Sequence, residues 1–232
     1  MEEEQKDLTD PEQEENKEKD QEKNKKSYIN SFIFLIVLIG IFASIMFLPK
    51  LFGPPSTESI IKDIIDQNET KDGYLYNGFV FIHQDDLWHT QWQKGDTMLN
   101  LHFHYGPRDV EKIPMIGSLD KNAKINEFYV TFGPNETNMS LIAVASSELG
   151  LNLVNGMNIK LTAACTYNDS ACAGRPIITC NNTNKSVIYI KTNDVTNVLL
   201  EKNCITIQGE GEDLIRSVDK FLFSSYQIIP RK

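Results

Sequence analysis

Polar and apolar side chains alternate along the segment from Leu87 to Tyr105. If Gly95-Asp96 forms a two-residue type II′ turn, with glycine at the position that needs a positive φ, the segment folds into a β-hairpin that pairs His89 with His102. Because neighbouring strand residues point to opposite faces, one face becomes apolar and the other polar. The apolar face holds Trp88, Thr90, Trp92, Leu99, Leu101 and Phe103, and the polar face holds His89, Gln91, Gln93, Asn100, His102 and His104.

Hydrophobic periodicity predicts further strands and helices after the hairpin. A strand at 127–132, a helix from Asn138 to about 155 and a strand at 159–165 form a βαβ unit with a parallel pair. The expected fold class is α+β, with a mixed sheet, a β-hairpin region and a C-terminal amphipathic helix. The other expected strands are 74–84, 176–180, 187–191, 195–201 and 203–208, the other expected helices are 56–67 and 212–226, and 109–116 is a short helix or irregular.

An uncharged run from Ile29 to Leu48 is the longest apolar segment of the chain. Twenty residues at about 1.5 Å each span about 30 Å, the thickness of the hydrocarbon core of a bilayer. Three lysines at 23, 25 and 26 precede the run and Lys50 follows it. Positive charge stays on the cytoplasmic side, so we expect a single-pass signal anchor at 28–49 with its N-terminus in the cytoplasm. The alternative is a cleavable signal peptide, which would have a shorter apolar core and an A-x-A-like site.

The anchor divides the chain into an N-terminal tail (1–27), a linker (50–55) and an extracytoplasmic α+β domain (56–232). Residues 1–26 hold eleven acids and six lysines, a net charge of −5 out of −9 for the whole chain. This segment has almost no large apolar residue, so we expect a disordered acidic tail in the cytoplasm. It serves either as a docking arm for a partner or as a solvated leader. The chain has no basic stripe, and this excludes the usual nucleic-acid-binding classes.

All four cysteines lie in the outer domain, at Cys165, Cys172, Cys180 and Cys204. An even number outside the membrane predicts two disulfides, for which three connectivities are possible. We favour Cys165–Cys172, which closes a short loop, and Cys180–Cys204, which ties two strands. A four-cysteine zinc site is the alternative, but such sites usually contain C-x-x-C pairs, and the spacings here are 7, 8 and 24 positions.

N-glycosylation sequons are more frequent in the outer domain than chance would give. Six N-x-[S/T] sequences occur there without proline in the middle. They predict a glycoprotein of a eukaryotic or archaeal envelope. The acceptor asparagines are Asn68, Asn135, Asn138, Asn168, Asn181 and Asn184.

The four histidines lie between positions 83 and 104. In the predicted register His89 faces His102, and His104 lies two positions along the same face. Such neighbours have Cβ atoms about 5 Å to 7 Å apart, so the three imidazoles are able to converge on one Zn²⁺ and leave a fourth position for water. Asp85 or Asp86 would then orient a ligand. The other interpretation is a histidine-rich polar sheet face without a metal.

Four stretches of the outer domain carry a resemblance to known proteins. YNGFVF (76–81), FHYGP (103–107), CAGRPIITC (172–180) and NCITIQGEGEDLIRSVDKFL (203–222) resemble segments of uncharacterised single-span, membrane-anchored proteins of small-genome archaea. The resemblance implies an envelope setting and an archaeal source, and it brings no function with it.

These patterns together favour a membrane-anchored binding or envelope protein that is not an enzyme. Its expected partners are the membrane and an envelope protein, glycan or membrane complex. We assign no catalytic and no cofactor-binding residue. The alternative is a metal-dependent ectodomain, a Zn-type hydrolase that uses His89, His102 and His104 on the hairpin.

Overall fold

The computed structural model describes residues 34–42, 44, 61–62, 64, 66, 69–70 and 72–231, and the chain divides into two units, Met1–Pro55 and Ser56–Lys232. In the first unit, residues 34–42 and 44 are helical with exposed apolar side chains. The Ser44 hydroxyl donates to the Gly40 carbonyl at 2.8 Å, so this polar group is satisfied inside the helix. Over the described residues, no helix has both the length and the apolar character needed to cross a membrane. The acidic tail, the linker and most of the predicted anchor and of the helix 56–67 lie outside the described residues.

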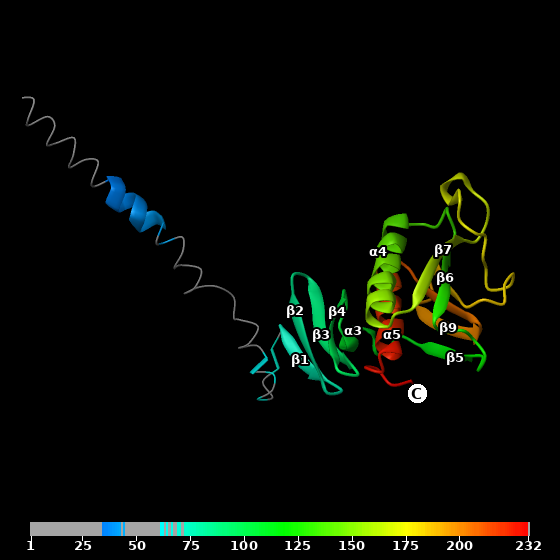
Figure 1. Ribbon diagram of the computed structural model, residues 1–232, viewed down its shortest axis with the longest axis horizontal. Coiled ribbons are helices and arrows are strands. Elements are labelled where there is room, and N and C mark those ends of the chain that lie inside the picture. Colours follow the sequence, from blue (N-terminus) through cyan, green and yellow to red (C-terminus); the bar gives the residue numbers. More distant parts are fainter. Residues whose placement is uncertain are drawn as a thin grey trace, which may run out of the picture. The chain divides into compact units, whose positions relative to one another are not determined.

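A four-stranded antiparallel sheet, sheet A, begins the second unit (Figure 1). Its strands follow one another in the order of the chain, and each pair is joined by a two-residue turn. The predicted hairpin register is confirmed: Trp92 pairs with Leu99, His89 pairs with His102, and Gly95 has a φ of +58°. The strands are β1 (Gly73–Tyr76), β2 (Phe79–Gln84), β3 (Leu87–Lys94) and β4 (Thr97–Phe103).

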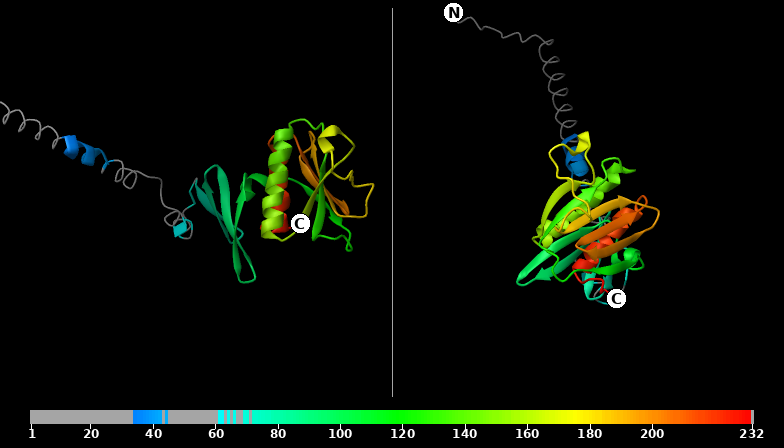
Figure 2. Two further views of the ribbon diagram at one scale, coloured as in Figure 1. Left: turned by 45° about the horizontal axis from the view of Figure 1, so that its top comes forward. Right: turned by 90° about the vertical axis from the view of Figure 1, so that its right-hand side faces the viewer.

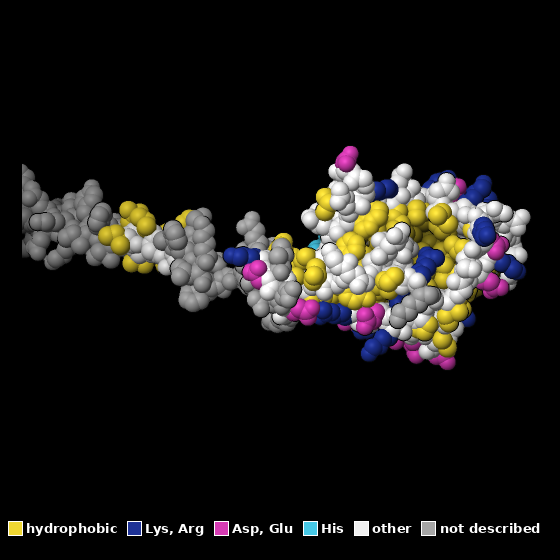
Figure 3. Space-filling model, turned by 90° about the horizontal axis from the view of Figure 1, so that it is seen from below, with side chains coloured by type: hydrophobic (Ala, Val, Ile, Leu, Met, Phe, Trp, Pro, Cys, Tyr) yellow, Lys and Arg dark blue, Asp and Glu magenta, His cyan; other side chains and the backbone are white. Residues whose placement is uncertain are grey.

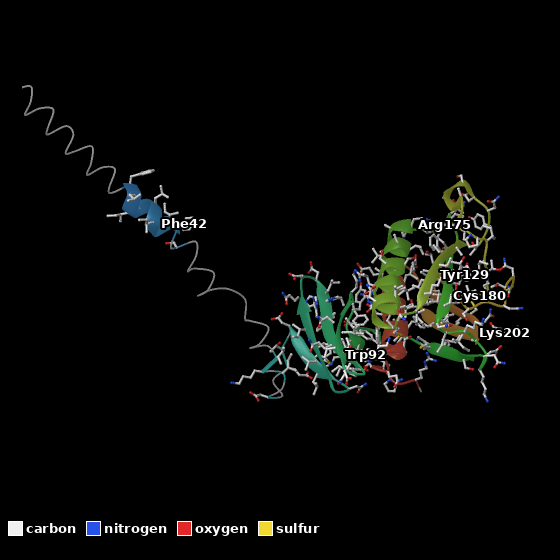
Figure 4. All side chains as sticks on the ribbon, viewed as in Figure 1. Phe42, Trp92, Tyr129, Arg175, Cys180 and Lys202 are labelled. Atoms are coloured by element: carbon white, nitrogen blue, oxygen red, sulfur yellow. A yellow bond between two sulfur atoms is a disulfide. The ribbon has the colours of Figure 1, made fainter. Side chains whose placement is uncertain are left out.

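The apolar face of sheet A points into the core, as the alternation predicted. Leu101 and Phe103 are buried, whereas Trp88, Trp92 and Leu99 are partly buried and pack against the core. The Trp92 indole N–H donates to the carbonyl of Tyr226 at 3.2 Å, and the two rings meet edge to face. Trp92 is labelled in Figure 4.

A six-stranded mixed sheet, sheet B, forms the other side of the domain. The strand order is β5-β9-β10-β8-β6-β7, and β6 and β7 are parallel as the βαβ pattern predicted. Only β9 and β10 are antiparallel neighbours. The strands are β5 (Met115–Leu119), β6 (Glu127–Phe132), β7 (Lys160–Cys165), β8 (Val187–Thr192), β9 (Asn197–Lys202) and β10 (Cys204–Gly209).

Two long helical segments lie between the two sheets, which gives three layers (Figures 1 and 2). One is α4 (Met139–Leu149), continued by the π-helix η1 (Gly150–Gly156), and the other is α5 (Asp213–Ser225). Phe223 of α5 contacts the rings of Phe81 and Phe103 in sheet A. On its other side, the Ser217 hydroxyl donates to the carbonyl of Gln208 in β10 at 2.8 Å. Four polar or charged residues of α5 are therefore buried as well, namely Ser217, Asp219, Lys220 and Ser224. The predicted C-terminal helix therefore packs on a sheet as expected, but on two sheets rather than one.

Two element predictions were wrong, and a third was right in extent but not in geometry. The expected strand 74–84 is the hairpin β1–β2, turned at Asn77 and Gly78 with φ values of 47° and 82°. The expected helix from Asn138 to about 155 is present as α4 and η1, but it changes to π geometry at Gly150. The segment 176–180 makes only an isolated bridge between Ile177 and Cys165. The segment left open at 109–116 includes the end of α3 (Pro107–Val110) and the start of β5, and a 3-10 turn, η2 (Ser170–Cys172), follows β7.

Candidate functional site

The outer face of sheet A, opposite the core, carries a groove of about 560 Å³. Within the described part of the chain, thirteen residues line it and none of them is charged, although charged residues make up 24% of the whole chain. The lining residues are Ile61, Gly78, Phe79, Val80, Ile82, Gln84, His89, Thr90, Gln91, Gln93, Met98, Asn100 and His102.

The groove has one apolar and one polar wall, and the two walls come from different strands. Val80 and Ile82 come from β2, and Ile61 precedes the sheet in the chain. The polar wall comes mainly from β3 and β4, where Gln91 pairs with Asn100 across the ladder. The Gln91 amide N–H donates to the Asn100 side-chain oxygen at 3.1 Å. The remaining Gln91 oxygen and Asn100 N–H groups are therefore left for a ligand.

His89 and His102 form a hydrogen-bonded pair on the polar wall. Their Nδ1 atoms are 2.7 Å apart, and Nε2 of His89 lies 3.0 Å from the carbonyl oxygen of Gln84. A carbonyl only accepts, so Nε2 of His89 donates to it. With one proton on each ring, His102 then donates from Nδ1 to Nδ1 of His89, and Nε2 of His102 is an acceptor. Burial and the neighbouring imidazole lower the pKa of His102.

His104, the third predicted metal ligand, turns away to Glu148 of α4. Its Nδ1 lies 2.9 Å from one carboxylate oxygen of Glu148, and its backbone N–H donates to the other at 3.0 Å. The hydrogen bond to Glu148 raises the pKa of His104. The structure therefore brings His89 and His102 together without His104. Over the described part of the chain, no three His, Cys, Asp or Glu residues are placed to hold a metal ion.

Asp219 of α5 is fully buried beside Glu148. One of its oxygens accepts the backbone N–H of Tyr105 at 2.8 Å, and the other has no donor. Burial first, and then the charge of Glu148, raise the pKa of Asp219 well above its ordinary value. The raised pKa favours the protonated form of the Asp219 carboxyl group in the fold.

Glu148 and Asn152 also close the free edge of sheet A. The strand β4 has no neighbouring strand on this side. Instead, Glu148 accepts the backbone N–H of His104, and the Asn152 amide donates to the carbonyl of His102 at 3.3 Å. Edge strands commonly pair with other chains unless something covers them. Here side chains of α4 and η1 occupy these positions.

Both favoured disulfides are present, Cys165–Cys172 and Cys180–Cys204. The loops that they fasten belong to sheet B. The five sequon asparagines within the described residues are exposed and lie in the loops β6–α4 and β7–β8, while Asn68 lies outside the described residues. The β7–β8 loop, yellow in Figure 1, lies on the sheet B side, away from β1–β4. None of the sequon asparagines within the described residues therefore lies on β1–β4, the strands of sheet A.

A second large hollow, of about 670 Å³, lies near the C-terminal segment. It is lined by Lys112 and Arg231 as well as Glu111, which accepts a hydrogen bond from Tyr76 at 3.2 Å. Figure 3 shows hydrophobic side chains gathered on the face seen from below. The second hollow is thus lined by both acidic and basic side chains, which distinguishes it from the groove on sheet A.

Glu148 and Asp219 are the site residues that sequence reasoning missed. The sequence does single out Glu148, because it is the only acidic residue between Asn138 and Asn155. Asp219 sits between Val218 and Lys220, and nothing in that pattern marks it as buried.

Comparison of the chain with protein-family models, with curated proteins and with solved structures finds no match. The lining of the groove and the arrangement of charge around it are the observations that bear on function.

Proposed function

We propose that this protein is a membrane-anchored, extracytoplasmic binding protein that contacts another envelope component through the outer face of sheet A. The carrying observation is the groove of about 560 Å³, which is open and has no charged side chain among the described residues that line it. Ligand sites combine an apolar lining with a few placed polar groups, and this groove has both.

Membrane anchoring is supported by the uncharged run from 29 to 48 and by the exposed apolar side chains of residues 34–42. An exposed apolar surface on a helix needs a partner or a lipid phase. The two disulfides and the exposed sequons support an extracytoplasmic position for the second unit.

Recognition rather than catalysis is supported by the chemistry of the polar wall. The side-chain amides of Gln84, Gln91 and Asn100 do not ionise and are poor nucleophiles. The imidazoles of His89 and His102 already hydrogen-bond to each other. The groups that face the groove are therefore suited to holding a ligand in place.

Introducing a charge into the groove should weaken retention by the envelope. Full-length protein in lipid nanodiscs would be passed over immobilised envelope fragments from the source cells. We expect Gln91→Lys to lower the bound fraction at least about tenfold, because a ligand that fits a neutral groove would have to bury an unpaired charge.

Ser118→Lys is the matched control, because Ser118 is exposed on β5 at the edge of sheet B. It should bind like the unmodified protein. Equal retention of Gln91→Lys and Ser118→Lys would contradict the proposal. Loss of retention in a chelator, with no effect of Gln91→Lys, would favour the metal-dependent alternative instead.

A further inference from the structure

We infer that the ligand of the groove is an uncharged glycan chain, which crosses the outer face of sheet A and continues around the β4 edge onto η1. This inference rests on the proposed function, because it names the ligand of the same groove.

The polar wall matches hydroxyl groups. Each primary amide offers N–H donors and a carbonyl acceptor, and a sugar hydroxyl is likewise both donor and acceptor. Gln84, Gln91, Gln93 and Asn100 are all exposed amides on this wall. His102 adds an acceptor at Nε2, because its Nδ1 proton is directed at His89.

The other wall matches the C–H face of a sugar ring. Ile61, Val80 and Ile82 supply apolar contact on the β2 side of the groove, and Met98 is 54% exposed at the end of the hairpin. A ring with polar edges and an apolar face can satisfy both walls at once. Phosphate, sulfate or carboxylate groups would find no positive side chain among the described residues that line the groove.

A peptide strand would lack its usual mode of attachment at this edge. Peptides often bind by adding a strand to a free sheet edge, through backbone hydrogen bonds. At β4 the carbonyl of His102 and the N–H of His104 already bond to Asn152 and Glu148. The edge is thus closed to strand addition at these two positions, whereas the side-chain amides beside it remain accessible.

A second hollow, of about 290 Å³, extends the same surface beyond β4. It shares Asn100 and His102 with the groove, and η1 contributes Asn152 and exposed Asn155. None of the described residues that line it is charged. The groove and this second hollow meet at Asn100 and His102, and amide side chains line both. Together they form an elongated path, which suits a chain of several sugars better than a single compact ligand. The π-helical geometry of η1 places its asparagines along this path, and π-helical turns occur frequently at functional sites.

Binding to defined oligosaccharides tests the inference. The probes are neutral oligosaccharides of one to six sugars, their uronic-acid counterparts, and neutral peptides rich in serine and glycine. The protein is the full chain in nanodiscs of phosphatidylcholine without glycolipid. We expect at least one neutral series to bind, with at least a tenfold gain in affinity between one sugar and the longest chain. The uronic-acid series should bind at least tenfold more weakly.

Asn155→Ala should abolish the gain with chain length and leave the binding of short sugars unchanged. Asn126→Ala, at an exposed asparagine of the β5–β6 loop, should behave like the unmodified protein. Binding of the peptides alone, or preference for the uronic-acid series, would overturn the glycan assignment. A length effect that persists in Asn155→Ala would overturn the extension onto η1. If Gln91→Lys still loses retention by envelope fragments in either case, the binding function stands and only the ligand is wrong.

Discussion

Removing the Cys180–Cys204 disulfide should lower the free energy of unfolding by about 3.5 kcal/mol. This bond joins residues 24 positions apart, and the entropy of closing a loop of that length in the unfolded chain sets the size of the effect. The Cys180→Ala/Cys204→Ala variant would be unfolded with urea. The two tryptophans, Trp88 and Trp92, report the transition because both pack against the shared core.

The Cys165–Cys172 bond is the internal comparison. Its residues are 7 positions apart, so its removal should cost about 2.5 kcal/mol, roughly 1 kcal/mol less than removal of the longer link. A reversed order of the two variants would contradict the loop-length explanation.

Asp219→Asn should make the folded protein more stable at pH 7 and almost unchanged near pH 4. In the fold, burial and Glu148 raise the pKa of Asp219, whereas in the unfolded chain the carboxyl has a pKa of about 3.9. The folded state therefore binds more protons, and stability falls by up to about 1.4 kcal/mol for each pH unit between 3.9 and the folded pKa. Asparagine does not ionise, yet its amide can donate to Glu148 and accept from Tyr105. The measurement is urea unfolding of both proteins from pH 4 to pH 8.

The groups that face Asp219 are the same in both proteins and do not remove the difference. Glu148 and His104 face it, and the raised pKa of His104 contributes stability that is lost as the pH rises through that pKa. The control is Asp194→Asn, at an exposed loop position between β8 and β9, which should leave the pH profile unchanged. Parallel profiles for the unmodified protein and Asp219→Asn would show that Asp219 is ionised in the fold.

Local pattern was enough to predict the hairpin of β3 and β4. Its register follows from alternation and from Gly95, and a slip by one residue would have reversed every side chain. The same kind of pattern predicted the parallel pair β6–β7 and both disulfides. In each case the signal lies within about 40 residues of sequence.

Where prediction failed, long-range packing or an overlooked turn decided the structure. Asn77-Gly78 is a strong hairpin signal, but the aromatic residues on both sides made the segment read as one strand. The burial of α5 between two sheets depends on Phe81 and Phe103, more than 100 positions earlier in the chain. Periodicity within a helix does not show how many layers cover it.

The candidate site divides in the same way. The polar wall with His89, Gln91 and His102 was evident from alternation in the sequence. The apolar wall is formed by Ile61 and by residues of β2, which lie outside the predicted hairpin. His104 is separated from the His89–His102 pair because it binds Glu148, 44 positions later in the chain. The prediction of a three-histidine cluster treated strand register as sufficient, whereas a helix supplies the partner of the third imidazole.

Histidine labelling is the most direct test of the claim that the outer face of sheet A is the binding face. All four histidines lie between positions 83 and 104, so diethyl pyrocarbonate reports this sheet alone. His102 lines the groove, and His104, exposed at the end of the same strand, does not line it. Rates of modification would be compared between purified protein in nanodiscs and protein in its native envelope. We predict that the native envelope slows modification of His102 at least tenfold and leaves His104 unchanged. Equal rates for His102 in the two settings would contradict the proposed binding face.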